Sequence, residues 1–379
     1  MKKIAIIGVS RFQEAALLKA KEMGLETHAF AWESGAPGEK MADYFYPISI
    51  REEDEILEKC RQIGIEGIIS IGSDLAMNVV NYVAENMGLT GNSVEATRIS
   101  TNKYAMREAF AEGGVPSPIS LMAGTDTDLS GLKDAEFPMI VKPTDRSGSR
   151  GVNKVERFED LKEAVETACE ISFENKAVVE QFVEGDEYSI EYISCEGKHW
   201  LVAVTRKVTS GAPHFVETAH MQPWDLEPEV LEDLKSVCEH ALDVLMLKNG
   251  AAHIEVKIDS NNTIRVIEIG GRMGGDFIGS DLVPLTTGYD YVGEVIRIAM
   301  GEKIDEPKIE NKRRVRIRFL TDMEGIEEYY EIKKTRPESV FREVIDQSLL
   351  EDPSKLSIFE RDSFFIYERQ EAWLCLFHL

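Results

Sequence analysis

The first ninety residues alternate short apolar runs with amphipathic stretches. The apolar runs have the length of buried strands, and the segments between them repeat apolar residues every three to four positions, as helices do. This order is typical of βαβ units and a parallel sheet. The pattern predicts strands at 3–8, 26–32 and 65–71, and helices at 12–23 and 75–87. We therefore expect a small parallel α/β domain over residues 1–92.

The strand ends of this domain give little sign of a ligand. A dinucleotide-binding G-x-G-x-x-G turn starting at Gly8 would need glycines where Ser10 and Gln13 stand. Ser73 and Asp74 follow the strand at 65–71, where they could contact a substrate or cap the next helix. We favour capping, because Ser and Asp are preferred at helix N-termini.

Beyond residue 92 helical and strand patterns mix without strict alternation. They predict helices at 93–112, 158–171 and 228–247, and strands at 137–141, 153–155, 177–183, 188–194 and 199–205. Residues 208–223 show neither period and are expected to be irregular. Near the C-terminus, Arg314, Arg316 and Arg318 alternate with apolar residues, which predicts one basic face. We expect it to neutralise nearby carboxylates, and contact of one arginine with a substrate is the alternative.

Residues 253–276 carry the most informative pattern in the chain. Two alternating runs flank Asn261-Asn262, and asparagine tolerates the left-handed backbone of a two-residue turn, so we expect a β-hairpin. That turn would place Glu255 directly opposite Glu268, with their Cβ atoms roughly 5 Å apart. Two facing carboxylates need a cation between them, and oxygen ligands of this kind suit Mg²⁺. A solvated hairpin with one unfavourable acidic pair remains the alternative.

Composition narrows the class of protein. The chain has 379 residues, 43% of them hydrophobic, which suffices for two or three globular domains. Its formal net charge of −25 argues against nucleic-acid and anionic-membrane partners, because the long-range field would repel both. Five scattered cysteines without a C-x-x-C pair are typical of reduced thiols in a cytoplasmic protein. No apolar run approaches membrane-spanning length.

Several weaker features suggest a nucleotide site. A lysine lies in the helix at 93–112, and another ends the strand at 137–141. A loop of small residues at 144–152 could form an anion nest, although a plain hairpin loop is an open alternative and no Walker A motif is present. The strand at 177–183 runs into an acidic segment whose carboxylates and backbone could hold adenosine, or could be surface charge.

Taken in order over Ser93–Gly301, these features resemble the ATP-grasp superfamily. The matching motifs are V-K-P at 141–143, V-E-Q-F-V-E-G-D-E at 179–187 and E-I-G-G-R at 268–272. The resemblance implies an ATP-grasp fold after the small parallel α/β domain, with Glu255 and Glu268 as metal ligands. It also implies nucleotide-binding roles for Lys103, Lys142, Ser147, Gly148, Ser149, Gly151, Glu180, Val183 and Glu187.

Within the superfamily, the chain looks most like the L-amino acid ligase group of carboxylate–amine ligases. The F-V-E-T-A-H pattern at 215–220 and the arginine four residues after the second glutamate carry this likeness. It implies that Glu217, His220 and Arg272 lie beside the reacting groups. Gly270 departs from the family pattern, because many members have a metal-binding asparagine there. Asp276 is expected to shape the substrate pocket.

The resemblance implies an ADP-forming ligase that uses ATP and Mg²⁺, for which Mn²⁺ could substitute. A small-molecule carboxylate, plausibly an amino acid, would be activated as an acyl phosphate and joined to an amine. Alternatives are a bicarbonate-using enzyme of the carbamoyl-phosphate or biotin-carboxylase type, and a non-catalytic ATP-binding sensor. The resemblance also implies the domain bounds. They are an ATP-grasp domain at 93–302 with a mobile lid at 116–182, followed by an α+β segment at 303–379. The apolar tail at 363–379 should pack on the body or on a second subunit of a homodimer.

Overall fold

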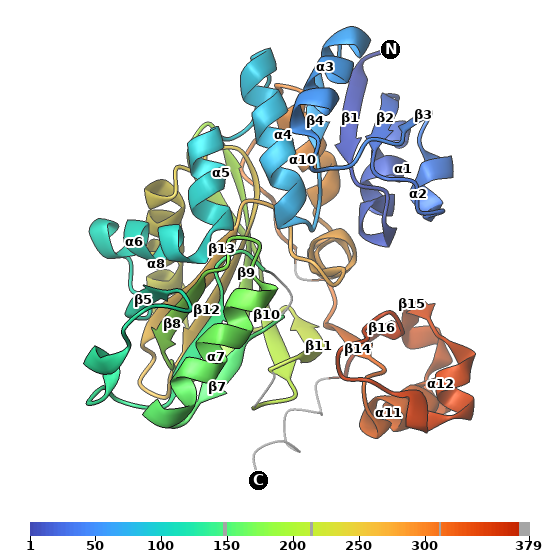
Figure 1. Ribbon diagram of the computed structural model, residues 1–379. Helices are drawn as coiled ribbons and strands as arrows, with labels where there is room; N and C mark the ends of the chain where they lie inside the picture. Colours follow the sequence, from blue (N-terminus) through green and yellow to red (C-terminus); the bar gives the residue numbers. More distant parts are fainter. Residues whose placement is uncertain (147–149, 213–214, 311, 371–379) are drawn as a thin grey trace.

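The computed structural model describes residues 1–146, 150–212, 215–310 and 312–370. Three sheets and the helices around them form a mixed α/β architecture, as expected from the sequence (Figure 1). Ser147, Gly148 and Ser149 of the predicted phosphate loop lie outside the described residues, as do residues 371–379 of the apolar tail. In the described part of the chain, no helix combines the length and the apolar character needed to cross a membrane.

The first sheet is parallel and has the strand order β3-β2-β1-β4. Every residue from Ile4 to Ile7 is fully buried, because helices cover both faces of the sheet. Gln13 occupies the turn where a dinucleotide-binding protein needs glycine, and its Oε1 accepts from the Ile71 N–H at 3.0 Å. The elements are β1 (Lys3–Ile7), η1 (Arg11–Gln13), α1 (Glu14–Glu22), β2 (Glu26–Phe30), α2 (Pro37–Met41), β3 (Tyr44–Tyr46), α3 (Glu53–Ile63), β4 (Gly67–Ile69) and α4 (Asp74–Met87).

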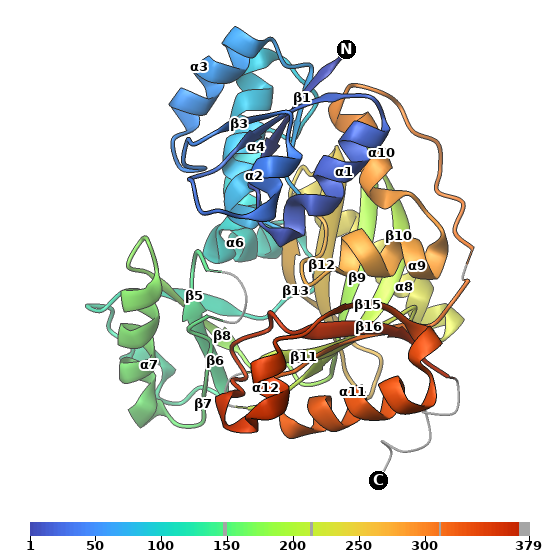
Figure 2. The same ribbon diagram turned by 90° about the vertical axis from the view of Figure 1, so that its right-hand side faces the viewer.

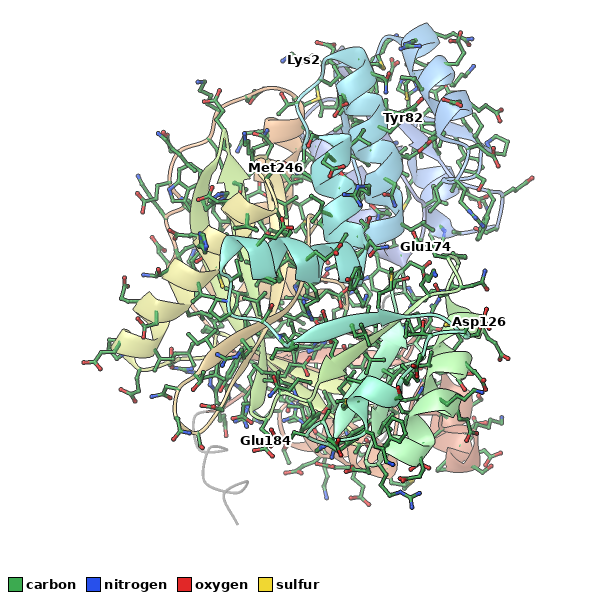
Figure 3. The ribbon with its side chains drawn as sticks, turned by 60° about the vertical axis from the view of Figure 1, so that its left-hand side comes forward. Lys2, Tyr82, Asp126, Glu174, Glu184 and Met246 are labelled. Atoms are coloured by element: carbon green, nitrogen blue, oxygen red, sulfur yellow. The ribbon has the colours of Figure 1, made fainter. Side chains whose placement is uncertain are left out.

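The second sheet is antiparallel, with the order β5-β8-β6-β7, and α7 packs on it. Its elements are β5 (Ser120–Ala123), η2 (Ser130–Leu132), β6 (Met139–Pro143), β7 (Asn153–Val155), α7 (Phe158–Ile171) and β8 (Ala177–Gln181). Tyr82 on α4 and Asp126 just beyond β5 mark the layers of the first and second sheets in Figure 3. These strands and α7 lie within the predicted lid, whose bounds and mobility stay predictions.

The predicted helix at 93–112 is wrong, because two helices occupy this stretch. They are α5 (Val94–Thr101) and α6 (Lys103–Gly113). Asn102 between them is extended, and its side chain accepts from the N–H groups of Tyr104 and Ala105. This cap starts a new helix. Lys103 is therefore the first residue of α6, and it is buried rather than on a solvated face.

The third sheet has eight antiparallel strands in the order β13-β12-β9-β10-β11-β14-β16-β15. Figure 2 shows α11 beneath β15 and β16 at one end of this sheet. The strands are β9 (Asp186–Cys195), β10 (Lys198–Thr209), β11 (Glu217–Gln222), β12 (Gly250–Ile258), β13 (Ile264–Gly270), β14 (Val315–Phe319), β15 (Val340–Val344) and β16 (Phe364–Glu368). The helical elements are α8 (Pro228–Val244), η3 (Ile278–Leu282), α9 (Val283–Thr287), α10 (Tyr291–Ala299), α11 (Met323–Thr335), η4 (Pro337–Ser339), α12 (Gln347–Glu351) and η5 (Pro353–Lys355).

Strand β11 corrects the expectation that residues 208–223 are irregular. It pairs with β10 on one side and β14 on the other, so the C-terminal segment continues the same sheet. The sequence E-T-A-H-M-Q has no clear apolar alternation, because both faces of the strand carry polar side chains. These side chains are largely buried against other elements.

The arginines of β14 behave as expected from the sequence. Arg316 and Arg318 are buried, and both lie within ion-pair distance of Glu328 on α11. Arg314 at the strand entrance pairs with Asp225.

Candidate active site

Glu255 and Glu268 face each other across β12 and β13, as the hairpin register predicted. The predicted turn, however, is wrong by one residue. Ile258 pairs with Ile264 beside the turn, and a bulge between Val266 and Glu268 restores the predicted register farther along. The bulged residue Ile267 turns its carbonyl toward Arg107, which donates to it at 2.5 Å. The one-residue shift at the turn and the extra residue in the bulge cancel, so the two carboxylates still face each other.

Lys207 on β10 holds the first of these carboxylates. Its Nζ lies 2.8 Å from Glu255, 2.7 Å from Glu187 and 3.2 Å from Glu217, and its side chain is 3% exposed. Burial alone would lower the pKa of Lys207, but the three carboxylates raise it well above its usual value. No sequence pattern marks Lys207. The register set at the β9–β10 turn would pair Arg206 with Glu187, and a bulge in β10 between Leu201 and Ala203 brings Lys207 to Glu187 instead.

Two further lysines enter the same cavity from other elements. Lys103 lies 2.8 Å from Glu268 and donates to the carbonyl of Arg146 at 2.5 Å. Lys142 on β6 lies 2.7 Å from Glu180, which also pairs with Arg107 at 2.8 Å, and all three of these side chains are at most 6% exposed. Desolvation lowers the pKa of Lys142, although Glu180 opposes the shift. The predicted phosphate lysines therefore converge on one cavity.

The cavity lies between the second and third sheets. Among the residues that line it are Lys103, Lys142, Arg150, Glu180, Phe182, Val183, Glu187, Lys207, Glu217, His253, Glu255, Ile267, Glu268 and Arg272. Each carboxylate oxygen of Glu180 pairs with a cation, Arg107 or Lys142. Its contact with adenine stays a prediction, and such a contact would have to come from its backbone. The carbonyl of Val183 accepts from Lys257 at 3.0 Å. Gly151 has a φ of 74°, a left-handed conformation that glycine adopts without strain.

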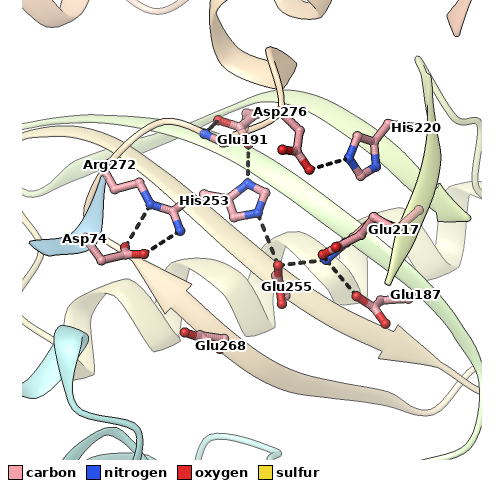
Figure 4. A network of polar contacts seen from close by, with 12 residues as sticks. Asp74, Glu187, Glu191, Glu217, His220, His253, Glu255, Glu268, Arg272 and Asp276 are labelled. Carbon is pink, nitrogen blue, oxygen red and sulfur yellow. Dashed lines mark hydrogen bonds and ion pairs between the residues drawn. The ribbon is translucent and has the colours of Figure 1, made fainter. Parts of the chain in front are cut away.

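Arg272 lies just beyond the end of the hairpin, where it meets Asp74, the first residue of α4. Its Nε and Nη2 each lie 2.8 Å from the Asp74 carboxylate, a bidentate pair (Figure 4). Ser73 caps α4 as expected, but Asp74 does not. Burial would raise the pKa of Asp74, and Arg272 holds it below its usual value.

Gly270 makes room for this ion pair. A Cβ atom at that position would lie 2.6 Å from Asp74 Oδ1 and 3.0 Å from Arg272 Cζ. The asparagine that many ATP-grasp proteins carry here would therefore displace the Asp74–Arg272 pair.

We predict that Gly270→Ala lowers the free energy of unfolding by about 1–3 kcal/mol, because it overpacks a buried site. In an Asp74→Ala background the same change should cost much less, since the nearest obstacle is gone and the guanidinium can move. Urea denaturation of the four proteins in this double-mutant cycle measures the coupling. Additive costs would contradict the steric explanation.

His220 and Asp276 meet close to Glu217, but neither is among the residues that line the cavity. His220 is 1% exposed, and its Nε2 lies 3.2 Å from Asp276 Oδ2. Burial would raise the pKa of Asp276, but His220 and Arg361 lower it to about 2. Asp276 has a φ of 51°, and Phe277 after it a φ of 64°. Two consecutive non-glycine residues in this sparsely populated region are a strain that functional sites often hold.

Arg361 is a second residue that the sequence analysis missed. It comes from the segment before β16, pairs with Asp276 and lies 2.9 Å from Glu217. Its position depends on a contact between residues more than 80 apart in the chain, and no local pattern marks it.

In the described part of the chain, no cluster of three or more His, Cys, Asp or Glu side chains has the arrangement of a metal site. The facing glutamates fit a divalent ion only if phosphate oxygens and water complete its ligands.

Residues 135–281 match the model of a family described as the ATP-grasp domain. This chain contains an ATP-grasp domain. The family match includes β6, β7 and β8 of the second sheet and the β12–β13 hairpin, the two sides of the cavity described above. Its superfamily is therefore the one that the order of motifs indicated.

Individual ATP-grasp proteins are similar over larger parts of the chain. Alanine–anticapsin ligase of Bacillus subtilis (strain 168) is 26% identical over 269 residues, which cover 62% of this chain and 57% of that protein. The C-terminal section of the carbamoyl phosphate synthase large chain of Aquifex aeolicus is 25% identical over 271 residues, covering 69% of this chain and 48% of that protein. The chain thus spans about half the length of these curated relatives.

A solved structure extends the likeness to the whole fold. The L-amino acid ligase of Bacillus licheniformis superposes with a TM-score of 0.80 at 20% identity, covering 99% of this chain and 95% of that one. At this identity the likeness concerns the fold alone. The ATP-grasp domain, its preceding parallel sheet and the C-terminal strands therefore share one known arrangement.

Proposed function

We propose that the protein is a Mg²⁺- and ATP-dependent, ADP-forming ligase. It activates the carboxylate of an amino acid as an acyl phosphate and joins it to an amine. The observation that carries this proposal is the facing pair Glu255 and Glu268 in a cavity lined by four lysines. Relatives that include an alanine–anticapsin ligase support it.

The proposed nucleotide site uses cations to hold an anion in an acidic protein. Lys103 and Lys142 would bind phosphate oxygens, with Ser147–Gly151 closing over them, and Glu187 would hold the ribose. Lys103 now pairs with Glu268, so nucleotide binding would exchange this pair for contacts with phosphate and metal. When bound, Mg²⁺ would neutralise charge on the phosphate oxygens. Mn²⁺ should replace it.

The reaction needs no nucleophile from the enzyme. The substrate carboxylate attacks the γ-phosphate, ADP leaves, and the amine then displaces phosphate from the acyl phosphate. The enzyme contributes position and charge. Arg272 would stabilise the developing negative charge, while Glu217, His220 and Asp276 would orient the carboxylate and the amine.

A second candidate is an enzyme that uses bicarbonate as the acceptor of phosphate. The similarity to the carbamoyl phosphate synthase large chain favours it. The two candidates differ in what triggers ADP release, because a bicarbonate enzyme should form ADP without an organic acid.

We expect ADP release from ATP and Mg²⁺ in the presence of a matched pair of amino acids, and little with either alone. A coupled ADP assay over pairwise mixtures of the twenty amino acids and small carboxylates tests this, with bicarbonate as a separate arm. ADP release with bicarbonate alone would favour the second candidate. Tight ATP binding without ADP release from any mixture would contradict both.

The oligomeric state can be tested on the same preparation. Light scattering coupled to size exclusion measures whether the protein is a homodimer. We also propose that it acts in the cytoplasm on small molecules, a location in which ATP and reduced thiols coexist.

A further inference from the structure

A buried chain of three side chains runs behind the facing glutamates. Glu191 on β9 is fully buried, and its Oε1 lies 2.5 Å from His253 Nδ1. The other ring nitrogen of His253 lies 3.5 Å from Glu255 Oε1. Figure 4 shows the three residues in line across neighbouring strands. Glu191 thus contacts the proposed metal ligand through one intervening ring.

The second oxygen of Glu191 holds the glycine-rich turn. Its Oε2 accepts the Gly274 N–H at 2.9 Å. Gly274 lies between Arg272 and Asp276, the two residues of this turn proposed to act on the reacting groups. One carboxylate therefore reaches both the metal-binding strand and the turn that follows it.

Glu191, His253 and Gly274 meet in one place, which we call the Glu191 joint. Its close packing is a second, independent sign that Glu191 has a positioning role. A Cβ atom at Gly274 would lie 2.5 Å from Glu191 Oε1 and 2.9 Å from His253 Nδ1. The backbone at 274 comes this near only because the residue is glycine. A buried carboxylate is costly unless fully bonded, and both oxygens of Glu191 have a partner here.

We propose that Glu191 is a positioning residue that fixes Glu255 and the 270–276 turn in one geometry. It would act through His253 on one side and through the Gly274 N–H on the other, without touching substrate. The inference rests on the proposed function, because it takes Glu255 as a metal ligand. Side chains that orient metal ligands commonly change metal affinity by about 10- to 100-fold when they are replaced.

Two substitutions disturb this joint in different ways. Glu191→Gln keeps the shape and one oxygen but removes the charge that faces His253. Gly274→Ala keeps every polar group but pushes a methyl group into the Glu191–His253 contact. If both act on one joint, the double variant should lose little more than the worse single variant.

The readout is the affinity for Mn²⁺ in the presence of a non-hydrolysable ATP analogue, measured by electron paramagnetic resonance on the full chain. We expect each single variant to bind Mn²⁺ about 10- to 100-fold more weakly. Steady-state assays should show a higher Mg²⁺ requirement and a lower kcat, with KM for ATP changed less.

Glu328→Gln is the matched control. Glu328 is also a buried carboxylate with two cationic partners, but it lies on α11 beneath the C-terminal strands. The Glu328→Gln substitution should lower the melting temperature and leave Mn²⁺ affinity within threefold of the wild type. Equal losses in Glu328→Gln and Glu191→Gln would mean that general destabilisation is the cause, and would overturn the inference.

Two remaining outcomes separate the inference from the proposed function. If the wild type binds Mn²⁺ with nucleotide and both joint variants bind it equally well, Glu191 has no positioning role while the ligase proposal stands. If the wild type binds no Mn²⁺ with nucleotide, the metal assignment fails and the inference fails with it.

Discussion

Replacing Glu268 with glutamine is expected to slow ADP release by about 10³-fold or more. The change keeps the shape of the side chain but removes one of the two carboxylates that face each other across the hairpin. A metal ion contributes several kcal/mol to stabilising charge in phosphoryl transfer, and about 4 kcal/mol corresponds to a factor of 10³. The fold should persist, because the glutamine oxygen can still accept from Lys103.

A coupled assay of ADP formation and a thermal melt check this result together. Glu196→Gln is the matched control, since Glu196 is an exposed carboxylate at the β9–β10 turn whose partner is Lys303. It should leave turnover unchanged. Turnover of Glu268→Gln within tenfold of the wild type would show that the metal assignment is wrong.

Replacing Lys207 with methionine is expected to lower the free energy of unfolding by about 3–5 kcal/mol at neutral pH. The lysine is 3% exposed and lies within 3.2 Å of three carboxylates. Its removal leaves Glu187, Glu217 and Glu255 crowded around the position of the lost ammonium group. Nucleotide binding should weaken as well, because the proposed ribose and metal carboxylates lose their common partner.

The stability loss should depend on pH in a defined direction. The pKa of Lys207 is raised from 10.5, so its stabilising contribution is complete below 10.5 and is lost as pH rises through the folded-state value. Burial would raise the pKa of Glu255, but Lys207 and His253 hold it well below 4.5. Its contribution is present above 4.5 and is lost as pH falls through the folded-state value. The variant's deficit should therefore be largest near neutrality and shrink toward pH 4, as Glu255, deprived of its lysine, takes up a proton.

Urea denaturation of both proteins between pH 4 and pH 9 measures this profile. Lys303→Met serves as the control, because Lys303 is 77% exposed and pairs with a single carboxylate. It should show no such pH dependence. A deficit for Lys207→Met that stays constant across the range would mean that lost packing, rather than carboxylate repulsion, is the cause.

The hairpin shows what a local sequence pattern can predict and what it cannot. The alternation at 253–270 identified two strands, and the asparagine pair marked the turn, where Asn262 indeed has a φ of 61°. The ladder beside the turn is nonetheless shifted by one residue, and a bulge corrects it. The bulge depends on Arg107 and on a hydrogen bond from the Val266 N–H to the Pro116 carbonyl, both outside the hairpin. The facing glutamates were therefore predicted correctly from an incorrect turn.

The sequence by itself determined the class of fold, the order of the nucleotide-binding motifs and the pairing of Glu255 with Glu268. Each of these follows from residues close in the chain, whose spacing fixes which face of a strand or helix they share. Only the tertiary structure decided what those residues contact. Lys207, Arg361, Asp74 and Glu191 reach the site from separate elements, and ion pairs across 48, 85, 198 and 62 residues respectively join them to it. Such contacts leave no local period, because their geometry is set by how the sheets pack rather than by the spacing of residues along the chain.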